Sequence, residues 1–74
     1  PSLLVYNPES VTVLTVHGST VKVWDACSGQ MVKEFVRMTR TDITGLALDR
    51  GRRKLIVSTL DGDISFHNYF TGKL

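Results

Sequence analysis

The stretch TVKVWDACSG, from Thr20 to Gly29, alternates polar and apolar side chains, reaches the pair Trp24-Asp25 and runs into a turn that the glycine closes. A related stretch, DISFHNYFTG, occupies Asp63 to Gly72. Its residues stand 43 positions after their counterparts, so that His67-Asn68 matches Trp24-Asp25. A fixed offset of about 20–50 residues is the mark of a repeat architecture. The sequence therefore predicts two copies of one structural unit.

Alternating and β-branched runs extend this pattern along the chain. The run VTVLTV, from Val11 to Val16, is dense in β-branched residues, which suit a pleated surface and lose rotamer freedom in a helix. The pair Asp61-Gly62 between two such runs is a strong hairpin signal. Apolar residues at helical spacing do not persist over three turns in any segment. We expect an all-β fold of two antiparallel, four-stranded units, the second of which lacks most of its last strand.

The turn residues set the expected boundaries. The first unit covers residues 1–36, with strands at 2–6, 11–16, 20–25 and 30–36; a loop covers 37–42; the second unit covers 43–74, with strands at 43–48, 54–59 and 63–68. Neither unit can bury its apolar side alone, so the two are expected to pack face to face. The residues expected at that contact are Val11, Val13, Leu14, Val21, Val23, Ile56, Val57, Ile64 and Phe66.

Composition excludes several classes of protein. The chain has 74 residues, a net charge of +2 and an apolar content of 42%, which is ordinary for a folded domain and too weakly basic to argue for nucleic-acid binding. No apolar run approaches the ~20 residues that a membrane helix needs. The single cysteine, Cys27, cannot form an internal disulfide, which favours an intracellular, cytoplasmic setting. Because the chain begins with Pro1, we expect it to be a piece of a longer protein.

At Trp24-Asp25, with the turn at Gly29 and the 43-residue period, the chain resembles the WD-repeat family of β-propellers. That family has a Trp-Asp signature, a period of about 40–45 residues and four strands in each blade. In the second unit, Asp61-Gly62, His67-Asn68 and Thr71-Gly72 stand at the family's positions. The resemblance covers the whole chain and implies one full blade and most of a second.

The resemblance also implies structural roles. Blades of this family often carry a hydrogen-bonded set of a His, a Ser or Thr, an Asp and the Trp. In the second unit Thr59 and Asp61 fill two of these positions, but Thr39 and His67 stand where the His and the Trp are usual. In the first unit Val16 and Gly18 replace the Ser or Thr and the Asp. Packing is therefore expected to hold the blades, and the structural residues are Trp24, Asp25, Gly29, Thr59, Asp61, Gly62, His67 and Gly72.

The function that the resemblance implies is a non-catalytic scaffold for protein–protein interaction in a multiprotein assembly, cytoskeletal or ciliary structures included. In this family the link between blades and the turn after the second strand share the rim that usually binds proteins. Carried over by position, the candidate contact residues are His17, Ser19, Arg37, Met38, Arg40, Thr41, Asp42 and Leu60. For any single one of them, an ordinary solvated loop is the simpler explanation. The remaining blades, or self-association of the fragment, are expected to cover the outer faces.

A small free-standing β-barrel or sandwich is the alternative, binding nucleic acid or phosphate through the turn from Arg50 to Lys54. Its cations, Arg52 and Arg53 among them, could neutralise phosphates. No aromatic residue is interleaved with them for base stacking, which favours a solvated turn. Charge reversal at Arg52 and Arg53 would separate the alternative from the scaffold.

Residues that could carry catalysis have simpler explanations. His67 with Asp61 and Thr59 could form a catalytic or metal cluster, but a structural hydrogen bond explains them. Zinc needs about four N or S ligands, and Cys27 is expected in a different turn from either histidine. We expect no enzymatic activity, cofactor or metal. Of the adjacent aromatics Tyr69 and Phe70, we expect one to pack beneath its blade and the other to contact a neighbour.

Overall fold

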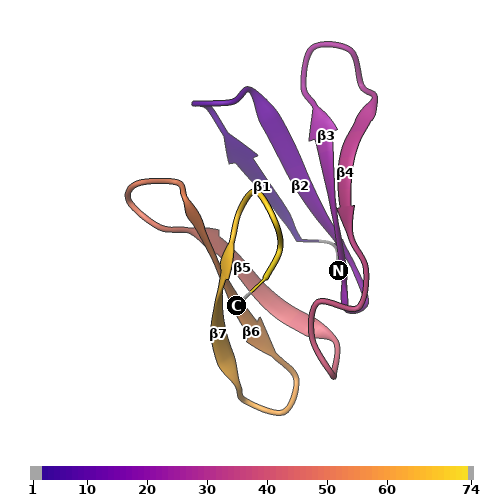
Figure 1. Ribbon diagram of the computed structural model, residues 1–74. Helices are drawn as coiled ribbons and strands as arrows, with labels where there is room; N and C mark the ends of the chain where they lie inside the picture. The colour runs from indigo at the N-terminus through magenta and orange to yellow at the C-terminus, as the bar shows by residue number, and fades with distance from the viewer. Residues whose placement is uncertain (1–2, 74) are drawn as a thin grey trace.

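A computed structural model describes residues 3–73, and over these residues the chain forms seven β-strands in two antiparallel sheets (Figure 1). The first sheet has the order β1-β2-β3-β4 and the second the order β5-β6-β7. The strands are β1 (Leu4–Asn7), β2 (Thr12–His17), β3 (Thr20–Asp25), β4 (Met31–Phe35), β5 (Ile43–Leu48), β6 (Lys54–Thr59) and β7 (Ile64–Asn68). The expected all-β fold of antiparallel strands is confirmed. Each strand begins and ends within two residues of its expected range; Ser2, expected in the first strand, and Leu74, expected to begin a further strand, lie outside the described residues.

The two sheets pack through one shared core. The buried apolar side chains are Leu14, Val21 and Val23 of the first sheet, Ile43, Leu55 and Val57 of the second, and Tyr69 in the turn after β7. The sheets lie closest along their first strands, β1 and β5. Figure 1 shows the turn after β7 folded between the two sheets, where they diverge. The core is therefore a wedge that is narrow at β1 and β5.

The expected contact between the sheets is wrong at five of its nine positions, three of which are exposed. Val11 is 39% exposed, Ile64 is 67% exposed and Phe66 is 52% exposed. Val13 and Ile56 are partly buried but lie on the outward faces of their sheets. The sequence match assigned Ile64 and Phe66 to the core because their counterparts Val21 and Val23 lie in it. The strand registers explain the error.

A one-residue difference in hairpin length shifts the repeat. In the first sheet Leu14 pairs with Val23, and His17 pairs with Thr20 around a two-residue turn. In the second sheet the amide of Thr59 donates to the carbonyl of Asp63 around a three-residue turn, Leu60 to Gly62. Ile56, not Val57, therefore pairs with Phe66. Strands before the hairpin match at an offset of 42 (Leu14 with Ile56), and those after it at 43 (Val23 with Phe66).

With this register, equivalent faces of the two sheets do not meet. The face of the first sheet that carries Leu14 and Val23 points inward, and the equivalent face of the second sheet, with Ile56 and Phe66, points outward. The second sheet packs inward with the opposite face, through Leu55, Val57, Ser65 and His67. These residues are equivalent to Val13, Thr15, Lys22 and Trp24, which lie on the outward face of the first sheet. The sheets are thus stacked front to back.

The turns after β3 and β7 are built alike. The Asp25 carboxylate accepts hydrogen bonds from the amides of Cys27 and Ser28 at 2.8 and 3.3 Å, and the Asn68 side chain accepts from Phe70 and Thr71 at 2.8 and 3.1 Å. Such side-chain bonds two or three residues along the chain are the reason that Asp and Asn favour turns. Each turn closes on a glycine with φ of 78°. The repeat therefore extends to hydrogen bonds as well as strands.

Candidate functional site

One end of the sheets gathers most of the residues that the sequence nominated for partner contact. We call this end the link rim; it consists of the turn at residues 18–19, the link at 37–42 and the turn at 60–62. The amide of Met38 donates to the carbonyl of Ser19 at 2.8 Å, and the amide of Leu60 donates to the carbonyl of Asp42 at 2.9 Å. The amide of Ile43 donates to Gly18 at 2.9 Å. Backbone hydrogen bonds thus join the three segments into one surface.

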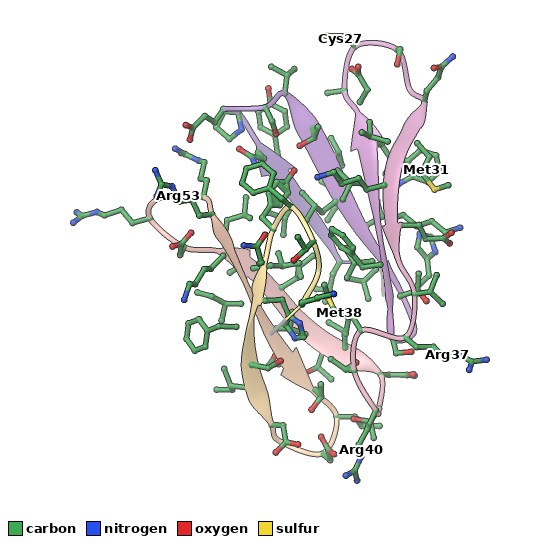
Figure 2. The ribbon with its side chains drawn as sticks, in the orientation of Figure 1. Cys27, Met31, Arg37, Met38, Arg40 and Arg53 are labelled. Atoms are coloured by element: carbon green, nitrogen blue, oxygen red, sulfur yellow. The ribbon has the colours of Figure 1, made fainter. Side chains whose placement is uncertain are left out.

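Exposure differs among the link-rim residues. Arg37 and Arg40 are exposed, and Figure 2 shows both side chains directed away from the sheets. Leu60 is 72% exposed. Met38 instead packs against the core cluster. The rim therefore offers two cations and one apolar side chain on a backbone fixed by hydrogen bonds, an arrangement that suits protein recognition because loops on a rigid scaffold carry many binding sites.

His17 belongs to a different surface. Its Nε2 lies 2.9 Å from the Thr15 hydroxyl, which accepts the indole N–H of Trp24 at 2.8 Å. Thr15 and Trp24 lie on the outward face of the first sheet. His17 thus completes a polar chain on that face, and the structure does not bring it together with Arg40 or Leu60.

Two cavities open at the link rim. One, of about 210 Å³, is lined by Met38, Thr39, Arg40, Thr41, Thr59, Asp61, Asp63, Ser65 and His67. The other, of about 350 Å³, is lined by Leu3, Asp42, Ile43, Thr44 and Leu60. Arg40 and Leu60 therefore each stand at the mouth of a hollow, where a partner side chain could be inserted beside them.

The buried histidine is fully occupied by structural hydrogen bonds. His67 is 4% exposed. Its Nδ1 lies 3.1 Å from the carbonyl oxygen of Gly72, which can only accept, so Nδ1 carries the proton. Its Nε2 then accepts the Ser65 hydroxyl at 2.8 Å. Among the hydrogen bonds of residues 3–73, none joins His67 to Thr59 or Asp61. The hydrogen-bonded set typical of WD-repeat blades is therefore not formed around His67.

Asp61 is held as a carboxylate by its turn. Thr59 donates a very short hydrogen bond to it, and Thr41 donates another at 3.2 Å. The Thr59 hydroxyl is the largest cause that lowers the pKa of Asp61 from its usual value; partial desolvation opposes this and the Thr41 hydroxyl adds to it. A carboxylate with a lowered pKa is a poor general base near neutral pH. Its role here is to tie the link to the second hairpin.

Within the described part of the chain, no group of three His, Cys, Asp or Glu side chains could hold a metal ion. Cys27 is exposed in the turn after β3, far from the link rim in Figure 2. Residues 3–73 also contain no helix long and apolar enough to span a bilayer.

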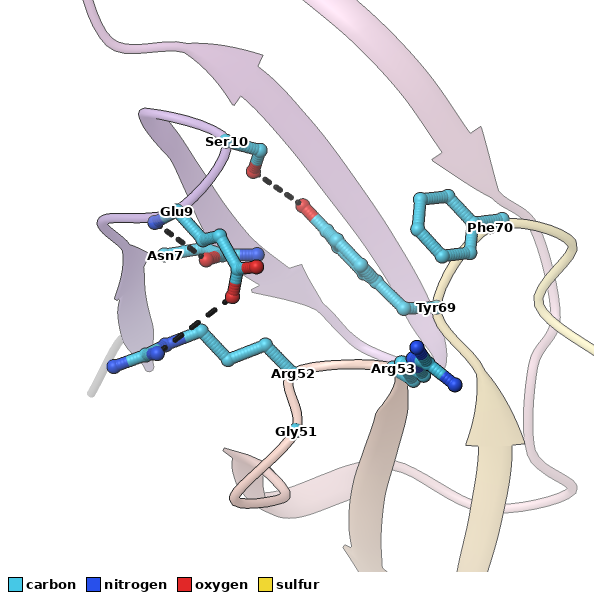
Figure 3. Close-up of a pocket in the computed structure, with 8 residues that line it drawn as sticks. All are labelled: Asn7, Glu9, Ser10, Gly51, Arg52, Arg53, Tyr69 and Phe70. Atoms are coloured by element: carbon cyan, nitrogen blue, oxygen red, sulfur yellow. Dashed lines mark hydrogen bonds and ion pairs between the residues drawn. The ribbon is translucent and has the colours of Figure 1, made fainter.

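The opposite end of the sheets holds a cavity that sequence reasoning did not find. The arginine pocket, of about 170 Å³, is lined by Asn7, Glu9, Ser10, Gly51, Arg52, Arg53, Tyr69 and Phe70 (Figure 3). Of the adjacent aromatics, Tyr69 packs between the sheets at 4% exposure and Phe70 is 62% exposed. The cations of this turn were considered alone, because the sequence does not show that Tyr69 reaches across to the first sheet.

Comparison with known proteins shows a similarity to a protein of cilia and flagella. The chain is 27% identical over 69 residues to Cilia- and flagella-associated protein 337 B of Tetrahymena thermophila. The alignment covers 93% of this chain and 6% of that protein, so the chain spans only a small part of its length. No family model matches the chain.

Proposed function

We propose that the chain is a non-catalytic protein-interaction module, formed by two successive blades of a larger WD-repeat-type propeller, in an assembly of cilia or flagella. The observation that carries the proposal is the front-to-back packing of the two sheets. A closed sandwich of two equivalent sheets would bury the same face of each. Front-to-back contact is heterologous, so it leaves one unmatched copy of each face and can continue into a ring or an open array.

The two outward faces support this reading because both carry apolar rows. On the first sheet, Tyr6, Val13, Trp24 and Met31 lie side by side across the four strands. On the second sheet, Ala47, Ile56 and Phe66 form the equivalent of the buried row. Tyr6 is 50% exposed and Phe66 is 52% exposed. Further blades on either side would cover these rows.

The wedge shape is a second support. The sheets converge along β1 and β5 and diverge toward their last strands. Blades arranged around a central channel must converge at their innermost strands. The Trp24-Asp25 pair and the repeated turns are consistent with this arrangement of blades around a channel.

The partner surface is assigned to the link rim, because Arg40 and Leu60 are exposed there beside cavities. Arg is enriched at protein interfaces, where its planar group gives directional hydrogen bonds. The ciliary setting rests on the similarity to the cilia- and flagella-associated protein of Tetrahymena.

Sedimentation velocity of the chain over a range of concentrations tests the stack. We expect the average mass to rise with concentration, because the outward rows associate, and Phe66→Ser to shift the chain toward monomer. The matched control is Leu60→Ser, which removes an even more exposed apolar side chain (72% against 52% for Phe66) from the link rim and should leave the mass unchanged. A monomer at all concentrations, or equal effects of the two substitutions, would count against the stack.

Retention of proteins from an extract of isolated cilia on the immobilised chain tests the partner surface. Arg40→Glu combined with Leu60→Ser should abolish retention of the specific partner. Cys27→Ser, at the other end of the sheets, is the control and should retain it. Retention that survives the rim substitutions would refute the assignment to the link rim.

A further inference from the structure

We propose that the arginine pocket binds an acidic side chain of a protein partner, with its carboxylate held by Arg53 and its methylene stem packed on Phe70. The pocket lies at the end of the sheets opposite the link rim and does not depend on the function proposed for that rim. It combines a fixed floor, an aromatic wall and a cationic border.

The floor is built by hydrogen bonds between the sheets. The Tyr69 hydroxyl lies 2.8 Å from the Thr12 hydroxyl, which in turn lies 2.7 Å from the hydroxyl of Ser10. Asn7 is 2% exposed, and its side-chain oxygen accepts the amide of Glu9 at 3.1 Å. A floor that spans both sheets fixes the depth of the pocket, so an incoming side chain meets a pre-organised surface.

The wall is the ring of Phe70. It lies 5.5 Å from the Tyr69 ring, tilted by 50°. The Lys33 ammonium lies 5.1 Å from the centroid of the Phe70 ring and donates a hydrogen bond to the Phe70 carbonyl oxygen at 3.2 Å. These contacts hold the ring in place although it is 62% exposed. An exposed aromatic ring that is held in position suits the methylene groups of a glutamate.

The border carries unneutralised positive charge. Residues 49–54 contain four cations, Arg50, Arg52, Arg53 and Lys54, against the single carboxylate of Asp49. Asp49 is occupied by the amides of Arg53 and Lys54, at 2.9 and 3.0 Å. Over residues 3–73, Arg53 forms no ion pair within 4.0 Å. Its planar guanidinium can donate two parallel hydrogen bonds to one carboxylate, which is the arrangement that Arg favours.

Glu9 already shows what the border attracts. Its carboxylate oxygen lies 3.7 Å from the Arg52 guanidinium, at the mouth of the pocket (Figure 3). Such an exposed, long ion pair contributes little. Figure 3 shows the Arg52 side chain directed toward Glu9 and away from Phe70, so the partner carboxylate is assigned to Arg53. Glu9 therefore partly neutralises Arg52 and leaves the charge of Arg53 for the partner.

The size of the cavity favours one side chain over an extended surface. A volume of about 170 Å³ corresponds to about five or six water molecules. A membrane surface would need a broad cationic face, whereas here the positive groups border a hollow with a ring on one side. We therefore assign the site to an acidic peptide segment, in line with the recognition of acidic motifs by arginine clusters.

Titration of the ¹⁵N-labelled chain with the blocked peptide acetyl-Gly-Glu-Phe-Glu-Gly-amide tests the site by NMR. We expect saturable shifts at the amides of Gly51, Arg52, Arg53 and Phe70. The peptide with Gln in place of Glu should bind about tenfold more weakly, because a neutral amide loses the charge-assisted hydrogen bonds that a carboxylate receives from Arg53. Arg53→Gln should weaken binding of the Glu peptide by about tenfold.

Arg50→Gln is the matched control, because it removes the same charge from the same turn without lining the cavity. It should change affinity by less than about twofold. Equal losses for Arg50→Gln and Arg53→Gln would overturn the site, as would equal binding of the two peptides or no saturable shift with the Glu peptide. Inorganic phosphate alone serves as a further probe; if it shifts these amides while the Glu peptide does not, the pocket is a free-anion site and the proposal is wrong.

Discussion

The two sheets share strands, turns and hydrogen bonds, yet they use opposite faces to make their common core. Trp24 and His67 occupy equivalent positions, but Trp24 lies on the outward face of its sheet and His67 lies buried at 4% exposure. The sequences differ accordingly: an indole can be partly covered by a neighbour, whereas an imidazole with both nitrogens hydrogen-bonded can be buried without an unpaired polar group. Equivalent positions in a repeat therefore carry different residues because their surroundings differ.

The largest expected effect contrasts the two equivalent positions Leu14 and Ile56. Leu14 is fully buried, and Leu14→Ala should lower the free energy of unfolding by about 2–5 kcal/mol, through lost burial and a residual cavity. Ile56 lies on the outward face, so Ile56→Ala should cost about 1 kcal/mol or less. Urea unfolding followed by circular dichroism measures both. Equal losses would mean that the sheets bury equivalent faces after all.

A smaller contrast lies in the two repeated turns. Gly72 and Gly29 both have φ of 78°, which disfavours any residue with a Cβ. At Gly72 a Cβ would also lie 2.6 Å from Cδ1 of Phe35 on the first sheet, whereas at Gly29 nothing lies within 4 Å. We expect Gly72→Ala to cost about 2–3 kcal/mol and Gly29→Ala about 1 kcal/mol. The same unfolding measurement applies, and a larger loss at Gly29 would show that the turn after β7 does not press on Phe35.

The hydroxyl of Tyr69 sharpens the comparison further, because it joins the second sheet to the first. Burial alone would raise the pKa of Tyr69, but hydrogen bonds from Ser10, Thr12 and Asn7 and the charge of Lys33 outweigh it and lower the pKa below 10.0. Tyr69→Phe should cost about 1 kcal/mol, because Thr12 keeps a bond to Ser10. Spectrophotometric titration of the wild-type tyrosines provides the check, and we expect one tyrosine to ionise below pH 10. If no tyrosine ionises below pH 10, this hydrogen-bond network does not form.

The smallest expected effect concerns the stability of the second sheet at acid pH. Two carboxyl groups of the second sheet have lowered pKa values, Asp49 mainly through the amide of Lys54 and Asp61 mainly through the hydroxyl of Thr59. A lowered folded pKa stabilises the fold above the unfolded value near 3.8, and this stabilisation is lost as the pH falls through the folded pKa. Hydrogen exchange between about pH 4 and pH 2.5 should therefore show the second sheet opening before the first. Asp49→Asn combined with Asp61→Asn should remove the difference; if it persists, other groups cause it.

Strand positions could be predicted because they depend on local patterns. Alternation, β-branched runs and the residues Gly18, Gly29, Gly62 and Gly72, all at positive φ, mark strands and turns without knowledge of the partner sheet. The difference in length between the two hairpin turns could not be predicted from such local patterns. The turn from Leu60 to Gly62 has one residue more than the turn in the first sheet. The sequence alignment used the 43-residue offset of the strands after this turn for the strands before it as well, so the extra residue was missed. Ile64 and Phe66 were consequently assigned to the core although they lie on the outward face.

The candidate sites divide in the same manner. The link rim was located by position from the resemblance to WD-repeat blades, which implies that the link and the turn after the second strand share one rim. Backbone hydrogen bonds do join Met38 to Ser19 and Leu60 to Asp42 there. The arginine pocket could not, because it needs Tyr69 of the second sheet against Thr12 of the first, a contact between residues 57 positions apart.

By itself, the sequence determined that the chain is all-β, where its strands and turns lie, and that it is a repeat. Only the tertiary structure decided which face of each sheet is buried, and hence which apolar rows stay open and where the cavities form. The physical reason is that side chains alternate along a strand, so burial depends on a register that a single turn residue can change.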